Sequence, residues 1–127
     1  MSQQEAFAAL TSKFADRIRV MCVYIQEAHA TNTWPFGLEI SFETTHTPEA
    51  RAEHAQFFCQ KFNFSHPTYI DVPPAQAFNA LFAAWPLRFY VFDSVDGGAR
   101  LSYVCQPEGD LVSVADVDRY LSARFDL

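Results

Sequence analysis

The residues best suited to acid–base chemistry follow directly after an apolar run. Glu27 and His29 come just behind residues 20–25 (VMCVYI), a run with no polar break. Histidine titrates near neutral pH, so His29 is a candidate proton donor in a reaction. A carboxylate two residues away can orient the imidazole or raise its pKa. This short segment is therefore a candidate site for proton transfer.

The three cysteines are the candidates for redox chemistry, and their positions do not favour it. Cys22, Cys59 and Cys105 form no CxxC pair, and neither they nor the four histidines have the spacing of a metal site. Cys22 lies within the apolar run and Cys59 follows Phe57 and Phe58, so we expect both thiols to be buried. Cys105 ends a predicted strand, and we expect it to be partly exposed. No metal is expected.

Composition limits the class of protein. The chain has 127 residues, of which 50% are hydrophobic and only 19% charged, which predicts one globular domain over residues 1–127. The net charge of −6 disfavours binding to nucleic acid or to an anionic membrane surface. No apolar stretch is long enough to span a membrane, and the N-terminus lacks the pattern of a signal peptide. We therefore expect a soluble, cytoplasmic protein.

Local patterns predict helices and strands in the order α-β-α-β-α-β-β-α. The helices are expected over about 2–17, from residue 48, over 77–85 and from residue 114, and the second should bury Ala50, Phe57, Phe58 and Phe62. The strands are expected over 20–25, 69–72, 88–92 and 100–105, the last two joined by a turn at 96–98. The helix caps are expected at Ser2 with Glu5, Thr47 with Pro48, and Ser113 with Asp116.

This order resembles the latter part of a thioredoxin-like fold in its peroxiredoxin-like variant. The expected architecture is α/β, with a mixed sheet of about four strands flanked by helices. The first strand of that fold, which carries the redox residue at its end, would precede Met1. In such folds the N-terminus of the following helix lowers the pKa of the redox residue.

A more specific resemblance covers residues 24–34. Residues 24–31 (YIQEAHAT) with Trp34 resemble the YIEEAHA-(S/T)-DGW segment of the iodothyronine deiodinases. Residues 69–71 (YID) and 86–91 (PLRFYV) resemble a short strand and a P-E-R-L-Y-V stretch of the same family. The chain departs from the family at residues 32–33, where Asn-Thr replaces Asp-Gly, and at Gln26, which replaces a Glu.

The resemblance implies a reaction and a set of site residues. Members of that family remove iodine reductively from an iodinated phenol with a selenocysteine, which a thiol reductant then restores; no other cofactor is implied. The resemblance implies that Tyr24, Glu27 and His29 form the proton-delivering network, and that Trp34, His46 and Arg88 contact an iodinated or halogenated phenol. His54 and His66 match no motif and are expected at the surface.

The family's nucleophile has no counterpart in this chain, which leaves three interpretations open. The chain can be the body of a deiodinase-like enzyme whose selenocysteine segment lies upstream of Met1, where a UGA codon would be taken for a stop. It can be a non-catalytic binding or assembly subunit, a pseudoenzyme, that forms a homodimer or a larger complex. It can be a thiol-dependent reductase or peroxidase. Thioredoxin-like folds also place a cis-proline beside the site, which makes Trp85–Pro86 a candidate cis bond.

Overall fold

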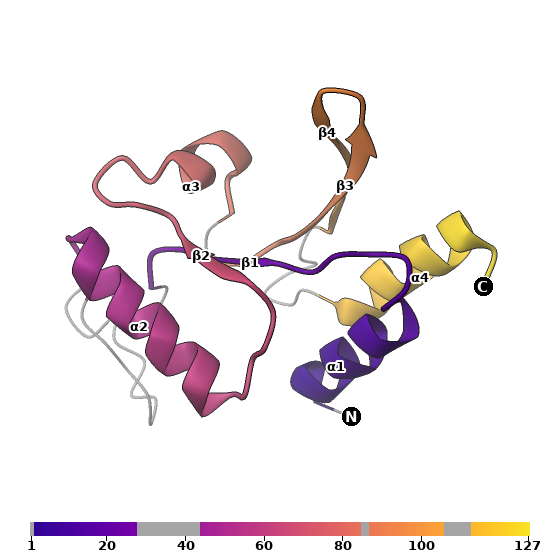
Figure 1. The fold of residues 1–127 in the computed structure, drawn as a ribbon, viewed down its shortest axis with the longest axis horizontal. Helices are drawn as coiled ribbons and strands as arrows, with labels where there is room; N and C mark the ends of the chain where they lie inside the picture. Colours follow the sequence, from indigo (N-terminus) through magenta and orange to yellow (C-terminus); the bar gives the residue numbers. More distant parts are fainter. Residues whose placement is uncertain (1, 28–43, 85–86, 106–112) are drawn as a thin grey trace. The chain divides into compact units, whose positions relative to one another are not determined.

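The computed structural model describes residues 2–27, 44–84, 87–105 and 113–127 (Figure 1). These residues group into two compact units: unit 1 comprises Met1–Arg19 and Leu87–Leu127, and unit 2 comprises Val20–Pro86. The predicted element order is confirmed. The elements are α1 (Gln3–Lys13), β1 (Cys22–Tyr24), α2 (Pro48–Lys61), β2 (Thr68–Ile70), α3 (Ala77–Phe82), β3 (Phe89–Val95), β4 (Gly98–Cys105) and α4 (Val114–Phe125).

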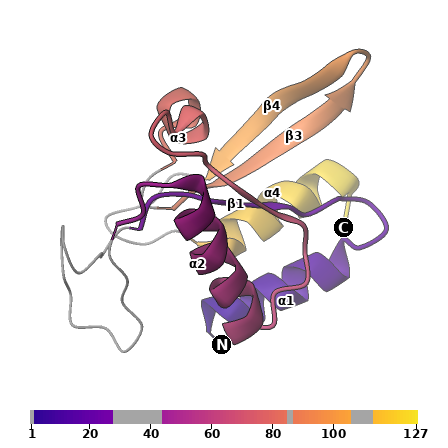
Figure 2. The same ribbon diagram turned by 60° about the vertical axis from the view of Figure 1, so that its left-hand side comes forward.

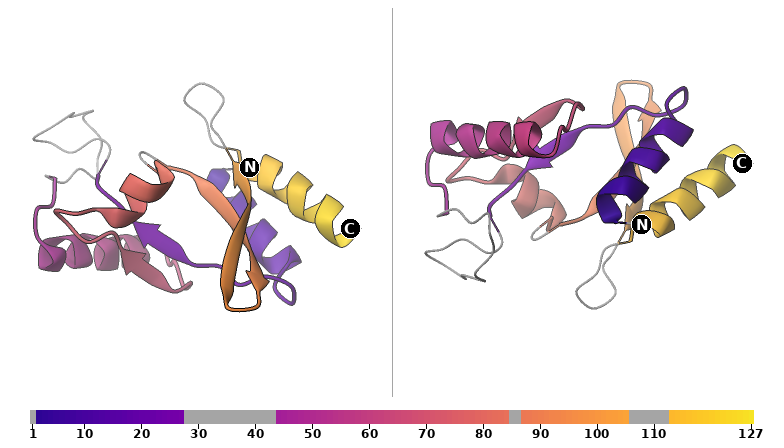
Figure 3. Two further views of the ribbon diagram at one scale, coloured as in Figure 1. Left: turned by 90° about the horizontal axis from the view of Figure 1, so that it is seen from above. Right: turned by 90° about the horizontal axis from the view of Figure 1, so that it is seen from below.

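In unit 1, two helices pack on one face of a hairpin. The hairpin of β3 and β4 is antiparallel, pairs Phe89 with Cys105, and extends as a long two-stranded ribbon in Figure 2. Its turn uses Gly97 at φ +82°, a conformation that L side chains rarely adopt. Helix α1 lies behind the hairpin in one view of Figure 3 and in front of it in the opposite view. The helices and the hairpin therefore enclose an apolar core.

The core of unit 1 is formed largely by α1, whose start is capped, and by the apolar face of α4. Ser2 Oγ accepts from the backbone N–H of Glu5 at 3.1 Å, and the Glu5 carboxylate accepts from the Ser2 amide at 2.7 Å, which completes the predicted capping box. Phe14, at the end of α1, is completely buried. The buried residues of this cluster are Leu10, Phe14, Cys105, Val114, Val117 and Leu121.

In unit 2, helix α2 is built beside a short parallel pair of strands. β1 and β2 pair Cys22 with Thr68 and Tyr24 with Ile70, and both strands are at most half-buried. Thr47 Oγ1 accepts from the Ala50 amide at 3.1 Å, so the predicted cap of α2 is confirmed. A cluster of aromatic rings centred on Phe58 connects the helix to the strands; its other members are Tyr24, Phe62 and Phe64.

Two predictions about helices are wrong. Phe57 and Phe62 were expected in the core but are 42% and 41% exposed, and α2 instead buries Arg51 and Ala55. The helix turns Arg51 inward because its guanidinium meets the polar partners described below. Ser113 precedes α4 as predicted, but its side chain makes no capping hydrogen bond. The first-turn Asp116 instead pairs with an arginine one turn later.

The prediction of one mixed sheet also needs correction. The chain is mixed α/β with four helices and four strands among the described residues, but hydrogen bonds join the strands as two separate two-stranded sheets. The parallel pair belongs to unit 2 and the antiparallel pair to unit 1. Strands of only three residues in β1 and β2 offer few backbone groups for further pairing. The prediction of a single domain stays a prediction.

Two further expectations concern the backbone and the membrane. The cis peptide bond found in the described residues joins Pro73 to Pro74, whereas Trp85 and Pro86 lie outside them. None of the helices in the described ranges has the length and apolar character that crossing a bilayer requires.

Candidate functional site

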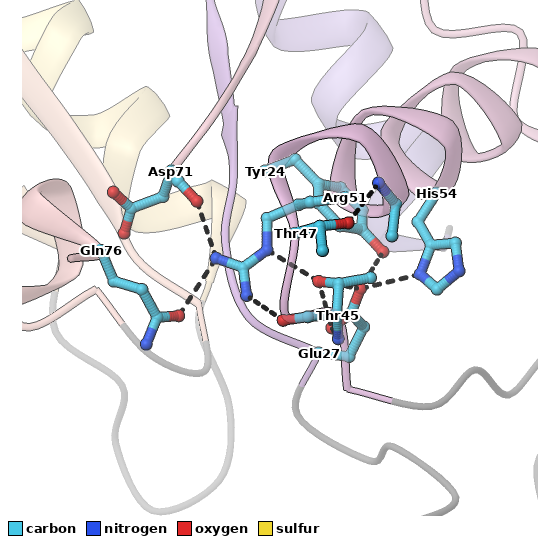
Figure 4. A network of polar contacts seen from close by, with 9 residues as sticks. Tyr24, Glu27, Thr45, Thr47, Arg51, His54, Asp71 and Gln76 are labelled. Atoms are coloured by element: carbon cyan, nitrogen blue, oxygen red, sulfur yellow. Dashed lines mark hydrogen bonds and ion pairs between the residues drawn. The ribbon is translucent and has the colours of Figure 1, made fainter. Parts of the chain in front are cut away.

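Glu27 lies just beyond the carboxyl end of β1, where three other side chains meet its carboxylate (Figure 4). His54 Nδ1 donates to Glu27 Oε1 at 2.9 Å, and Tyr24 Oη lies 3.4 Å from the same oxygen. The backbone N–H of Thr45 donates to Oε2 at 3.2 Å, and the Thr45 hydroxyl contacts both carboxylate oxygens. Glu27 is therefore the acceptor that joins β1, α2 and the segment before α2.

The surroundings of Glu27 favour its charged form. Burial raises the pKa of this carboxyl, but hydrogen bonds from His54, from its own backbone amide and from the Thr45 amide outweigh burial, so the pKa lies below its ordinary value of 4.5. The side chain is only 9% exposed. A buried carboxylate that accepts several hydrogen bonds stays ionised at neutral pH.

The lowered pKa of Glu27 gives unit 2 a specific acid dependence. A carboxyl whose pKa is lower in the folded state stabilises the fold fully above its unfolded pKa, near 4.5, and loses that contribution as the pH falls through the folded pKa. Glu27→Gln should therefore flatten the fall in stability below about pH 5. Urea unfolding at several pH values measures the slope. The exposed Glu53 of α2 supplies the control, since Glu53→Gln should keep the wild-type slope.

Tyr24 is a hydrogen-bond donor in this site rather than a titrating group. Burial raises the pKa of its phenol, and the charge and hydrogen bond of Glu27 raise it further. The phenol therefore keeps its proton throughout the physiological range. Tyr24 can orient Glu27 and hold a proton near it, but it is not suited to release that proton.

Arg51 continues the network on the other side of Thr45. Its side chain is 1% exposed, and its Nε donates to Thr45 Oγ1 at 2.8 Å. Nη2 donates to the Thr45 carbonyl at 3.1 Å, and Nη1 donates both to the Asp71 carbonyl at 2.7 Å and to Gln76 Oε1 at 3.1 Å. Burying a charge costs free energy unless hydrogen bonds replace water. Here the loop residues around α2 and α3 supply them.

Asp71 positions the segment that leads into α3. Its carboxylate accepts from the backbone amides of Phe78 at 2.9 Å and Asn79 at 2.9 Å, which satisfies two of the unpaired N–H groups at the start of the helix. In Figure 4 the carboxylate points away from the guanidinium of Arg51, which uses the Asp71 carbonyl instead. The two oxygen types of Asp71 thus connect α2 to α3.

A pocket of about 250 Å³ opens beside this network. It brings together the segments before α2 and before α3, and it includes the cis-linked prolines. Its lining residues are Gln26, Thr44, Thr45, His46, Arg51, Pro73, Pro74 and Gln76. Among these described lining residues there is no cysteine and no carboxylate.

The structure brings some of the predicted site residues together. Tyr24 and Glu27 contact each other, and His46 is exposed at the rim of the pocket next to them. His29 and Trp34 lie outside the described residues. Arg88 belongs to unit 1, is half-buried, and donates from Nη1 to the carbonyl of the preceding residue at 2.8 Å. Its predicted role in binding stays a prediction.

Sequence reasoning missed three residues of the network. His54 was expected at the surface but bonds to Glu27 with a side chain 22% exposed, and Thr45 and Arg51 were not among the predicted site residues. His66, also expected at the surface, is half-buried, and its ring meets that of Phe64 edge-on. One signal was available, because Arg51 and His54 lie three residues apart and so share a face of α2.

Two of the three thiols lie in surroundings that disfavour reactivity. Burial, together with the nearby Cys59, raises the pKa of Cys22 to about 11, so this thiol stays protonated at neutral pH. Cys22 and Cys59 are half-buried rather than fully buried, and Cys59 lies 3.4 Å from the Thr68 hydroxyl. Cys105 is 1% exposed, contrary to the expected partial exposure, because its strand end closes the core of unit 1. The described ranges contain no cluster of three metal-binding side chains.

Comparison with protein-family models, with curated proteins and with solved structures finds no match to this chain.

Proposed function

We propose that this chain is a thioredoxin-type, iodothyronine-deiodinase-like domain that binds an iodinated phenol beside Glu27. The observation that carries the proposal is the contact between Tyr24 and Glu27 at the carboxyl end of β1, next to a pocket rimmed by His46. The sequence resemblance assigns this tyrosine and glutamate to proton delivery. Ligands of α/β proteins commonly bind at the carboxyl ends of parallel strands, which favours the same location.

The reaction implied by the resemblance needs a nucleophile and a proton. A selenolate attacks the iodine, the carbon–iodine bond breaks with its electron pair left on the aromatic carbon, and a proton adds to that carbon. The products are the dehalogenated phenol and a selenenyl iodide. Two equivalents of a thiol then restore the selenol and release iodide as they become a disulfide. The residues around Glu27 support the protonation step. The three cysteines of this chain are thiols, so the selenol that attacks the iodine must be a separate group.

Within the proposed site, Glu27 holds an imidazole and a phenol in hydrogen-bonding positions. An imidazole that is hydrogen-bonded to Glu27 is oriented to donate a proton to a leaving carbon. His54 occupies such a position in the described residues. His29, from the same segment as Glu27, is the residue that the resemblance assigns to this step. His46 is proposed to contact the phenol oxygen from the rim of the pocket.

A second candidate is binding without catalysis, and the state of the thiols favours it over a thiol-dependent reductase. Such a reductase needs a thiol that ionises near neutral pH and can be reached by solvent. The pKa of Cys22 is raised, Cys105 is buried, and no cysteine lines the pocket. A domain of this kind would bind the phenol, alone or within a homodimer, without turning it over.

Titration with 2,6-diiodophenol tests the proposal. Iodine quenches the fluorescence of the two tryptophans of the chain, so binding should give saturable quenching that plain phenol does not give. His46→Ala should weaken binding about five- to tenfold, which is the loss of roughly one hydrogen bond. His66→Ala is the matched control and should bind like the wild type. Quenching that never saturates, or that is unchanged in His46→Ala, would overturn the proposed site.

An iodide assay separates the two candidates. With a small aryl selenol and dithiothreitol present, the enzyme interpretation expects faster iodide release in the presence of the chain than in its absence. Saturable binding with no acceleration of iodide release would favour the non-catalytic domain.

A further inference from the structure

The pocket beside Arg51 combines a buried cation with the absence of any acidic lining residue. The chain carries 15 acidic residues against nine lysines and arginines, yet no aspartate or glutamate is among the described residues that line the pocket. The guanidinium of Arg51 is the one side chain among them that is always charged.

Arg51 has no direct counter-ion in the described part of the chain. None of the ion pairs found there within 4.0 Å includes Arg51. Its acceptors are two backbone carbonyls, a hydroxyl and an amide oxygen, all of them neutral. Glu27 is reached only through the Thr45 hydroxyl, and the Asp71 carboxylate is bound to the amides of α3. A buried positive charge without an anionic partner is costly.

The guanidinium also retains one donor. Arginine has five N–H groups, and four of those of Arg51 donate to Thr45, Asp71 and Gln76. The second N–H of Nη2 meets no acceptor among the described residues, and the side chain lines the pocket. A buried donor of this kind is normally satisfied by a bound group or by water.

We propose that this pocket is an oxyanion-binding site in which Arg51 contacts a carboxylate or phosphate group through Nη2. Hydrogen bonds from a guanidinium to such oxygens are charge-assisted and short, and they replace the missing counter-ion. The volume of about 250 Å³ holds a small organic acid or a phosphate, since one water takes up roughly 30 Å³ in the liquid. Gln76 and the Thr45 hydroxyl fix the guanidinium in place. The site does not depend on the proposed reaction with iodinated phenols.

Gln76 offers a substitution that tests the site without emptying it. Gln76→Glu places a carboxylate where an amide oxygen now accepts from Arg51 Nη1 at 3.1 Å, so the chain supplies its own anion. The variant keeps the hydrogen bond and should fold. Gln56→Glu, at an exposed position of α2, makes the same change of charge away from the pocket and serves as the matched control.

The experiment is an NMR titration of the full chain, observed at the Arg51 Nε–H signal and the Gln76 side-chain amide. Sodium acetate, sodium phosphate and sodium chloride are added at constant ionic strength and pH. We expect acetate or phosphate, but not chloride, to shift the Arg51 signal saturably, and whichever saturates identifies the class of anion. Gln76→Glu should weaken this binding by about tenfold or more, because the new carboxylate competes with the added anion for the charge of Arg51. Gln56→Glu should leave the binding unchanged.

Three outcomes would overturn the proposal: no saturable shift with either oxyanion, an equal shift with chloride, or undiminished binding in Gln76→Glu. Because none of these measurements uses a phenol, a negative result here leaves the phenol titration to be judged separately.

Discussion

Replacing Arg51 with methionine should lower the free energy of unfolding of unit 2 by about 3–5 kcal/mol, since buried acceptors lose their hydrogen-bond donor. Methionine fills part of the volume but offers no N–H. The carbonyls of Thr45 and Asp71 and the side-chain oxygen of Gln76 would each lose a hydrogen bond that the structure now provides. Because natural domains are stable by only about 5–15 kcal/mol, this loss would leave unit 2 close to unfolding at room temperature.

Native-state hydrogen exchange is the appropriate measurement for this variant, because it reports each unit separately. Amides of β1 and α2 should lose protection in Arg51→Met. Arg51→Lys is an informative comparison: lysine keeps the charge but cannot span Thr45, Asp71 and Gln76 with one planar group, so an intermediate loss is expected. If Arg51→Met exchanged like the wild type, the network would not be what stabilises unit 2.

Phe14→Ala should destabilise unit 1 by about 3–5 kcal/mol, the usual cost of removing a fully buried aromatic ring. Phe14 is 0% exposed, and its ring packs against that of Phe125 with centroids 5.9 Å apart. The cavity would open between α1 and α4, where the backbone has little freedom to collapse because both helices also pack on the hairpin.

Phe92→Ala provides the matched control for this substitution. It removes the same ring from a residue of β3 that is 42% exposed, and it should cost well under half as much. Urea unfolding followed by circular dichroism gives the difference between the two variants. Equal losses in both would contradict the position of Phe14 at the centre of the unit 1 core.

Local signals accounted for most of the fold. Some structural signals are local. Ser2 and Thr47 cap helices by bonding to amides three residues further on, and Gly97 shapes the hairpin turn at its own position, so the sequence alone reveals them. The order of helices and strands followed from them. Pairing between strands depends on groups far apart in the chain. For that reason the two separate sheets could not be foreseen from the residues of β1 or β3 alone.

The candidate site was predicted only where its residues are close in sequence. Tyr24 and Glu27 are three residues apart, and the structure brings them together as expected. Arg51 and His54 reach the same network from α2, and a hydrophobicity pattern assigns such residues to the solvent-facing side of a helix. Burial of Arg51 and His54 is favourable only because Thr45 and Glu27 accept their hydrogen bonds. Both acceptors lie before α2, so the pattern of α2 alone does not reveal them.

The way Arg51 shares its partners has a consequence for how this sequence can diverge. One guanidinium serves three residues, and the Thr45 hydroxyl connects it to Glu27, so each group is satisfied only while the others remain. Substitutions within such a set are strongly non-additive. A descendant sequence would keep these positions together or exchange them together. Selection should therefore remove single substitutions at these positions more readily than substitutions at the exposed positions of α2.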